Sequence, residues 1–167
     1  MTRHYYINEC PGGRGRGVFA NRAFVPGEYI LSFSGKHTPI HEIIDFTHYL
    51  QVAPGMFLSP TGKEDDFVNH SCDPNCAVYF ENGGAVLRAV AHIARNDELS
   101  FDYGTVMFSE PTTFHCECGS PKCRGLIGSF YTLPETLRHY YLTKNMVPLL
   151  NHYTLEELRL AENTQAI

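Results

Sequence analysis

Short apolar strings, separated at close spacing by turn residues, fill the chain from its start to about Gly104. In the string EYILSFSG, the residues Tyr29, Leu31 and Phe33 alternate with Ile30 and two serines, a period of two that is typical of a strand. Farther along, CAVYFE and AVLRAVAHI flank the turn NGG and predict a β-hairpin, and YLQV and MFLS are also strand-like. These short apolar strings with turn residues between them predict a mostly β fold with short helices.

Three segments have helical signals. Residues 39–45 predict one short helix, with Thr38 as its cap and three isoleucines on one face, Ile40, Ile43 and Ile44. Residues 134–145 predict a second helix, and Thr154 with Glu157 forms a capping box ahead of a third. We expect residues 129–167 to form a C-terminal helical extension and not a separate domain.

The length and the charge of the chain limit what it can bind. A chain of 167 residues with 43% hydrophobic and 19% charged residues predicts one globular domain with a real core. Its net charge of −5 and its lack of a long basic run argue against direct nucleic acid binding and are compatible with a basic peptide partner. Without an apolar signal segment or a stretch of membrane-spanning length, we expect a soluble, intracellular protein that binds no membrane.

The cysteines indicate a metal site. The string CECGSPKC places Cys116, Cys118 and Cys123 at a spacing that lets three thiolates converge on one cation, and tetrahedral zinc needs four ligands. From the spacing alone, the fourth ligand can be Cys72, Cys76, Cys10 or the neighbouring His115. A site closed by four protein ligands organises structure and does not activate water.

Four strings in a fixed order carry a resemblance to a known family. They are GRGVFA at 15–20, FVNHSCDPN at 67–75, ELSFDYG at 98–104 and CECGSPKC at 116–123. Together they resemble a SET-domain protein lysine methyltransferase with a post-SET zinc segment, in a minimal form without a cysteine-rich pre-SET segment. The resemblance spans 12–125 and implies a β-clip-like fold of small sheets. In that fold a pseudoknot places the Asn-His string beside the Asp-Tyr string. We expect a SET domain at 1–111, a post-SET segment at 112–128 and the extension at 129–167.

The resemblance also implies how the cofactors are held. Gly15, Arg16 and Gly17 match the loop that presents its backbone to S-adenosylmethionine, and glycines suit a close approach of the main chain. The further residues that match cofactor contacts are Asn69, His70, Tyr49 and Leu126. For the single structural zinc ion, the family takes its fourth thiolate from the cysteine after Asn-His-x, so the implied ligands are Cys72, Cys116, Cys118 and Cys123.

Three aromatic residues match the lysine side of the site. Tyr103 matches the catalytic tyrosine, which orients the attacking amine and need not be a general base. Phe101 stands at the position where the family carries Phe or Tyr, and a phenylalanine there leaves room for di- or trimethylation. Phe33 matches the wall of the lysine channel, at a position where many members carry tyrosine.

The function that the resemblance implies is S-adenosylmethionine-dependent methylation of a lysine in a protein or peptide, with a histone tail as one substrate. The lack of a hydroxyl at Phe33 leaves open a second class, a SET fold that binds peptides without efficient catalysis. Calorimetric titration of the cofactor separates these two. A third class, a hydrolytic metalloenzyme, needs a metal with three protein ligands and a water.

Overall fold

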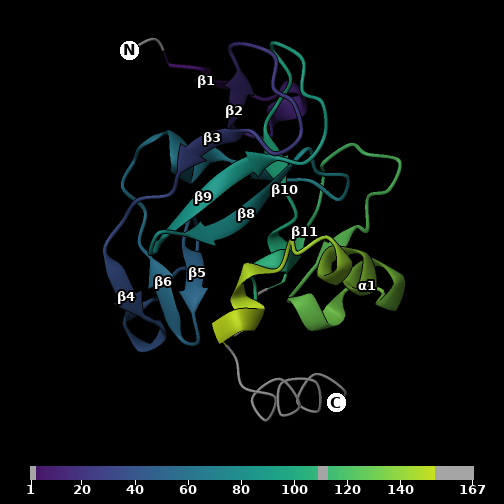
Figure 1. Ribbon diagram of the computed structural model, residues 1–167. Helices are drawn as coiled ribbons and strands as arrows, with labels where there is room; N and C mark the ends of the chain where they lie inside the picture. The colour runs from purple at the N-terminus through teal and green to yellow at the C-terminus, as the bar shows by residue number, and fades with distance from the viewer. Residues whose placement is uncertain (1–2, 109–112, 153–167) are drawn as a thin grey trace.

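The computed structural model describes residues 3–108 and 113–152 (Figure 1). Its strands are short, the longest having six residues. In chain order they are β1 (Tyr5–Glu9), β2 (Arg16–Ala20), β3 (Tyr29–Ser32), β4 (His37–Pro39), β5 (Leu50–Ala53), β6 (Met56–Leu58), β7 (Asn69–His70), β8 (Cys76–Glu81), β9 (Gly84–Ala89), β10 (Ser100–Phe101), β11 (Phe114–His115) and β12 (Leu126–Ile127). The described strands assemble into small separate sheets, which confirms the mostly β prediction.

The β8–β9 hairpin lies at the centre of the fold and pairs with β3 on its other edge. Its turn has Asn82 and Gly83 at positive φ, 51° and 79°, the conformation that a two-residue hairpin turn requires. The sheet β4-β6-β5 and the helix α1 (Glu135–Thr143) lie on opposite sides of this hairpin (Figure 1). The predicted hairpin is therefore confirmed. The strands predicted in EYILSFSG, YLQV and MFLS are confirmed as β3, β5 and β6.

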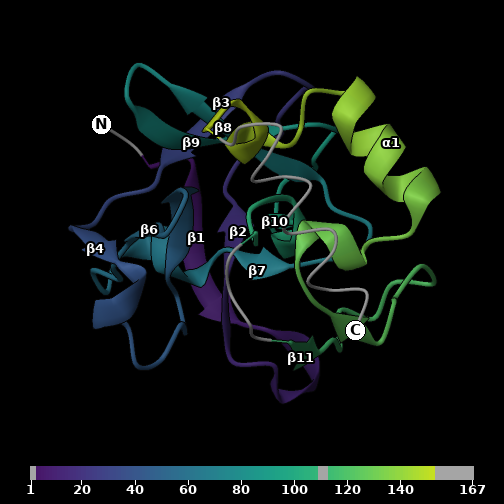
Figure 2. The ribbon, with the colours of Figure 1, turned by 90° about the horizontal axis from the view of Figure 1, so that it is seen from below.

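One pairing joins segments that are far apart in the sequence. Strand β7 pairs with β10 in parallel, with Asn69 opposite Ser100 and His70 opposite Phe101. The Ser71 N–H extends the pairing by donating to the Phe101 carbonyl over 3.1 Å. Figure 2 shows the two short strands side by side in the middle of the molecule. The Asn-His string therefore lies against the Asp-Tyr string, as the resemblance implied.

The described helices are short, and α1 alone among them is an α-helix. The 3₁₀ turns are η1 (Pro11–Gly13), η2 (Ile40–Glu42), η3 (Glu64–Phe67), η4 (Tyr103–Thr105), η5 (Phe130–Thr132) and η6 (Pro148–His152). The helix α1 confirms the prediction for 134–145. The predicted third helix, after Thr154, lies outside the described residues. None of the described helices is long and apolar enough to cross a membrane.

The predicted helix at 39–45 is wrong. Thr38 belongs to β4 and pairs with Phe57, so the chain is still extended where the cap was expected. Only the single turn η2 follows, and it contains no buried residue. Ile44 is fully exposed, and Ile40 and Ile43 are only partly buried, so the isoleucine face is not packed into the core. A short helix without tertiary packing is not stable in water, and the local signals are overridden.

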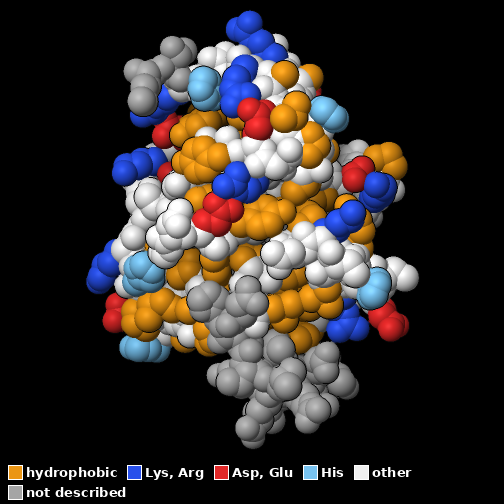
Figure 3. All heavy atoms as spheres, viewed as in Figure 1, with side chains coloured by type: hydrophobic (Ala, Val, Ile, Leu, Met, Phe, Trp, Pro, Cys, Tyr) orange, Lys and Arg blue, Asp and Glu red, His pale blue; other side chains and the backbone are white. Residues whose placement is uncertain are grey.

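A single core joins the sheets to the C-terminal segment. It contains residues of β8 and β9 together with Phe130, Leu133, Tyr141, Met146 and Leu149, all of them buried. The segment that begins at Ser129 therefore packs into the same core as the strands. On the face in Figure 3, acidic and basic side chains are interspersed among apolar ones. The surface pair Arg88–Glu81, at 2.6 Å, is an example of this mixing.

Candidate active site

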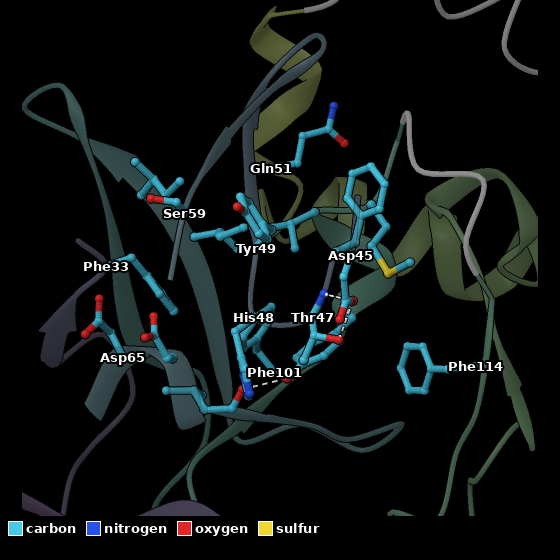
Figure 4. Close-up of a pocket in the computed structure, with 18 of the residues that line it drawn as sticks. Phe33, Asp45, Thr47, His48, Tyr49, Gln51, Ser59, Asp65, Phe101 and Phe114 are labelled. Atoms are coloured by element: carbon cyan, nitrogen blue, oxygen red, sulfur yellow. Dashed lines mark hydrogen bonds between the residues drawn. The ribbon is translucent and has the colours of Figure 1, made fainter. Parts of the chain in front are cut away.

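Two pockets meet at one aromatic wall. The larger, which we call the aromatic pocket, has a volume of about 370 Å³ (Figure 4). The smaller, which we call the polar pocket, has a volume of about 240 Å³ and is lined by Arg14, Asn69, His70 and residues of the segment 114–118. Tyr103 and Phe114 line both pockets. A molecule in one pocket can therefore approach a molecule in the other beside these two rings.

The shared wall is a continuous row of aromatic rings. Ring centroids lie 6.0 Å apart for Phe33 and Phe101, 4.8 Å for Phe101 and Tyr103, and 5.8 Å for Tyr103 and Phe114. Figure 4 shows Phe33 and Phe114 on opposite sides of the aromatic pocket. The structure thus brings together Phe33, Phe101 and Tyr103, which the sequence singled out, and adds Phe114, which it did not.

Acidic side chains line the aromatic pocket as well. Asp65 is buried and accepts hydrogen bonds from the Ser34 N–H and hydroxyl, at 2.6 and 2.9 Å, which ties η3 to the chain after β3. Asp45 is exposed, and hydrogen bonds from the Thr47 hydroxyl and N–H lower its pKa. Negative charge beside an aromatic channel favours a cationic ligand.

Tyr103 is held by both its main chain and its hydroxyl. Its N–H donates to His70 Nδ1 over 3.1 Å, and its hydroxyl donates to the Val68 carbonyl over 2.8 Å. Burial, with a smaller contribution from the Glu98 carboxylate, raises the pKa of Tyr103 well above its usual range. The hydroxyl therefore keeps its proton at neutral pH, and its oxygen can accept a hydrogen bond from a second group.

His70 is a neutral, fully engaged imidazole. Burial lowers its pKa to about 4, although the Asp102 carboxylate acts in the opposite direction. Because Nδ1 accepts the Tyr103 N–H, the ring hydrogen is on Nε2, which lies 3.3 Å from the Cys72 sulfur. His70 therefore links the Tyr103 backbone to the cysteine cluster. Its low pKa and its two contacts leave no nitrogen for a general base at neutral pH.

The glycine loop is fastened to Asn69, both directly and through the partly buried Glu98 carboxylate. Asn69 Nδ2 donates to the Arg16 carbonyl at 3.0 Å and to Glu98 Oε1 at 2.9 Å, and Arg14 donates to Glu98 Oε2 at 2.8 Å. Burial opposes the charge of Glu98, but the hydrogen bonds from Asn69, Arg14 and Cys10 prevail and lower its pKa. An ionised Glu98 therefore holds together two residues that line the polar pocket.

Four cysteine sulfurs converge next to the polar pocket. Those of Cys72, Cys116, Cys118 and Cys123 all lie within 4.8 Å of one another, and the Cys72 and Cys116 sulfurs are 3.8 Å apart. Sulfurs about 2.3 Å from a tetrahedral zinc ion are about 3.8 Å from each other, so the spacing of the cluster suits a metal held by four thiolates. The structure selects Cys72 over Cys10, which bonds to Glu98, and over Cys76, which is buried in β8.

A match to the model of a protein family identifies the family of this chain. The family model of the SET domain matches residues 15–104, more than half of the chain. The chain belongs to the SET-domain family.

Relatives of this SET domain are named as histone-lysine N-methyltransferases. The protein ash1 of Drosophila melanogaster is 33% identical in an alignment 131 residues long that covers 69% of this chain and 6% of that protein. An H3 lysine-36 specific enzyme of Emericella nidulans is 32% identical in an alignment 133 residues long that covers 69% of this chain and 13% of that protein. The chain thus spans a small part of the length of both relatives.

Solved structures share the fold. The structure titled KRYPTONITE in complex with mCHH DNA, an H3(1-15) peptide and SAH has a TM-score of 0.61 at 18% identity, covering 75% of this chain and 30% of that one. The structure of Arabidopsis thaliana SUVH6 in complex with SAM has a TM-score of 0.63 at 18% identity, covering 75% and 33%. At these identities the likeness shows the SET fold.

The predicted site residues are divided between several places. Asn69, His70 and Tyr103 line the polar pocket. The Arg16 carbonyl accepts a hydrogen bond from the Asn69 side chain. The Arg16 guanidinium instead lies 4.0 Å from the centroid of the Phe67 ring. Tyr49 lines the aromatic pocket instead. Leu126 is 55% exposed at the end of the cysteine segment, paired with His115. The roles of these residues toward a cofactor stay predictions.

Sequence reasoning missed Arg14, Phe114 and Glu98. Arg14 precedes the glycine loop in GRGRG, and Phe114 lies two residues before the first cysteine of CECGSPKC. Glu98 opens the ELSFDYG string, whose aromatic residues were singled out in its place. Their proximity to the matched motifs was the available signal, but only the long-range hydrogen bonds of the fold show what they contact.

Proposed function

We propose that this SET domain is an S-adenosylmethionine-dependent protein-lysine N-methyltransferase. The observation that carries the proposal is the meeting of a polar and an aromatic pocket at Tyr103. The names of the relatives as histone-lysine N-methyltransferases support it, and so do the SAM, SAH and H3 peptide in the titles of structures with the same fold. A lysine in a basic protein segment, such as a histone tail, is the proposed substrate.

The polar pocket fits the cofactor. Arg14 offers donors for a carboxylate, while His70 and Phe114 offer rings for an adenine. When bound there, S-adenosylmethionine supplies an electrophilic methyl group on a sulfonium. The four cysteines are proposed to hold one zinc ion, in a closed site that fixes the segment 114–126 over the pocket.

The aromatic pocket fits the lysine side chain. A free lysine has a pKa of about 10.4, so its amine must lose a proton before it can attack. Acidic side chains of the pocket attract the cationic lysine, whereas the aromatic wall and the positive sulfonium beside it disfavour the ammonium and lower this pKa; the released proton leaves to water. The Tyr103 hydroxyl donates to Val68, so its oxygen accepts from the amine and aims the nitrogen lone pair at the methyl carbon. A nitrogen–carbon bond forms as the carbon–sulfur bond breaks.

Phe101 sets the number of methyl groups in this proposal. It is buried and lies between Phe33 and Tyr103 in the aromatic wall, so no hydroxyl at this position holds the amine or a water. We therefore propose di- or trimethylation. Phe101→Tyr is expected to shift the products toward monomethyl-lysine, measured by mass spectrometry of a modified peptide. An unchanged product distribution at equal turnover would contradict this role.

Gly17 is predicted to be essential for the shape of the cofactor loop. A Cβ at this position would lie 2.6 Å from the Cys10 sulfur and 2.9 Å from both Asn69 Nδ2 and Glu98 Oε1, closer than side chains tolerate. Gly17→Ala is expected to weaken S-adenosylmethionine binding at least about tenfold, measured by calorimetry. Gly84→Ala, whose Cβ meets its nearest atom at 3.9 Å, is the control. Wild-type affinity in Gly17→Ala would show that the loop does not contact the cofactor.

The function is tested by methyl transfer from labelled S-adenosylmethionine to histones and to a peptide array, read by mass spectrometry. The zinc-loaded protein is expected to methylate lysine, and Tyr103→Phe to do so far more slowly. Calorimetry of the cofactor is run in parallel. Peptide binding with neither cofactor binding nor transfer would instead identify a binding module, and transfer to a residue other than lysine would overturn the proposal.

A further inference from the structure

A buried carboxylate adjoins the turn that begins at Tyr103, which we call the Tyr103 loop. Asp102 stands between Phe101 and Tyr103, and its side chain has no exposed surface. Arg124 donates to both of its oxygens, each over 2.8 Å, and the Gly104 N–H donates to Oδ1 over 3.0 Å. Its Oδ2 also accepts the Tyr141 hydroxyl, at 2.8 Å. The carboxylate thus has four donated hydrogen bonds.

These donors come from three parts of the chain. Gly104 belongs to the turn that carries Tyr103, Arg124 follows the last cysteine of the cluster, and Tyr141 is on α1. The helix lies beyond the residues that match the SET domain, on the side of β10 away from the β4-β6-β5 sheet (Figure 2). Asp102 therefore connects the Tyr103 loop, the cysteine segment and the C-terminal extension.

Tyr141 makes this connection deep in the core. It is 1% exposed, whereas its neighbour Tyr140 is 48% exposed. Burial and the adjacent Asp102 carboxylate raise the pKa of Tyr141, so its hydroxyl remains a hydrogen-bond donor. A buried carboxylate that loses one of its donors must find another or shift its position. A shift of the Asp102 carboxylate moves the Gly104 N–H group that donates to it, and this displaces the adjoining backbone of Tyr103.

We propose that Tyr141 is a positioning residue for methyl transfer, acting through Asp102 on the Tyr103 loop. The inference rests on the proposed function, in which the loop that carries Tyr103 is catalytic. It gives the C-terminal helical extension a role in positioning that loop. Tyr141 lines neither pocket, so its contribution is to hold geometry. Small displacements of catalytic groups lower turnover steeply, while the binding of substrate and cofactor depends on other contacts.

The test compares Tyr141→Phe with the matched variant Tyr140→Phe, each of which removes one hydroxyl from the same helix. Tyr141→Phe is expected to lower kcat at least about fivefold, with the cofactor Kd and zinc content unchanged. In the same protein, exchange of the Gly104 amide hydrogen, followed by NMR, is expected to accelerate at least about fivefold. Tyr140→Phe is expected to change neither quantity by more than about twofold.

The outcomes separate this inference from the function on which it rests. Wild-type kcat and wild-type Gly104 exchange in Tyr141→Phe would overturn it, and so would an equal loss in Tyr140→Phe. A loss of turnover that is matched by weaker cofactor binding would assign Tyr141 a general structural role and also overturn it. A failure of the proposed function appears already in the wild-type protein, and Gly104 exchange then still decides whether Tyr141 controls the loop.

Discussion

Cys72→Ser is expected to release the metal and to reduce methyl transfer by at least about a hundredfold. Cys72 is the one cysteine of the cluster that belongs to the SET core, while the other three lie within 116–123. Without it, the segment that carries Phe114 and Arg124 would lose the attachment beside the pockets that the proposed zinc ion provides. Phe114 lines both pockets and Arg124 contacts Asp102, so both the cofactor site and the Tyr103 loop are affected.

Zinc content, thermal unfolding and methyl transfer are measured together on this variant. Cys76→Ala is the control, because Cys76 is equally buried and only four residues away but lies outside the cluster. It is expected to keep one zinc ion per chain and most of its turnover. Removing zinc from the wild-type protein with a chelator should reproduce the Cys72→Ser defect, and added zinc should reverse it. Full turnover in metal-free protein would contradict the structural role of the ion.

Local sequence signals predicted the elements whose stability is local. The β8–β9 hairpin follows from NGG between two apolar strings, and α1 from the i, i+3, i+4 spacing of Leu137, Tyr140 and Tyr141, and both are present. The isoleucine pattern at 40–44 carried an equally strong local signal and failed, because nothing in the fold covers Ile44. The difference lies in tertiary packing, which decides whether a short amphipathic segment gains enough burial to form a helix.

Long-range placement needed more than local patterns. The parallel pairing of β7 and β10 involves two residues from each strand, too few to leave a periodicity in the sequence. The cysteine spacing predicted three ligands but left four candidates for the last; the resemblance implied Cys72, and the fold places its sulfur with the other three. Asp102 was visible as part of the SFDYG string, but its partners Arg124 and Tyr141 lie 22 and 39 residues away.

Tyr103→Phe is expected to lower kcat at least about tenfold, the effect of losing one positioning hydrogen bond worth about 1.4 kcal/mol. The ring remains in place between Phe101 and Phe114, so the aromatic wall is preserved. What is lost is the oxygen that accepts from the amine while its own hydrogen is held by the Val68 carbonyl. Because the pKa of Tyr103 is raised by burial, the hydroxyl acts as a fixed dipole, and its loss removes no general base.

The measurement separates binding from turnover. Cofactor Kd and peptide KM should change little in Tyr103→Phe, since the phenylalanine ring still lines both pockets and the aromatic wall is preserved. Tyr29→Phe is the control, because it removes an exposed hydroxyl that contacts Ser32 on β3. A fall in affinity with unchanged kcat would make Tyr103 a binding residue. Wild-type kcat would remove its hydroxyl from the reaction.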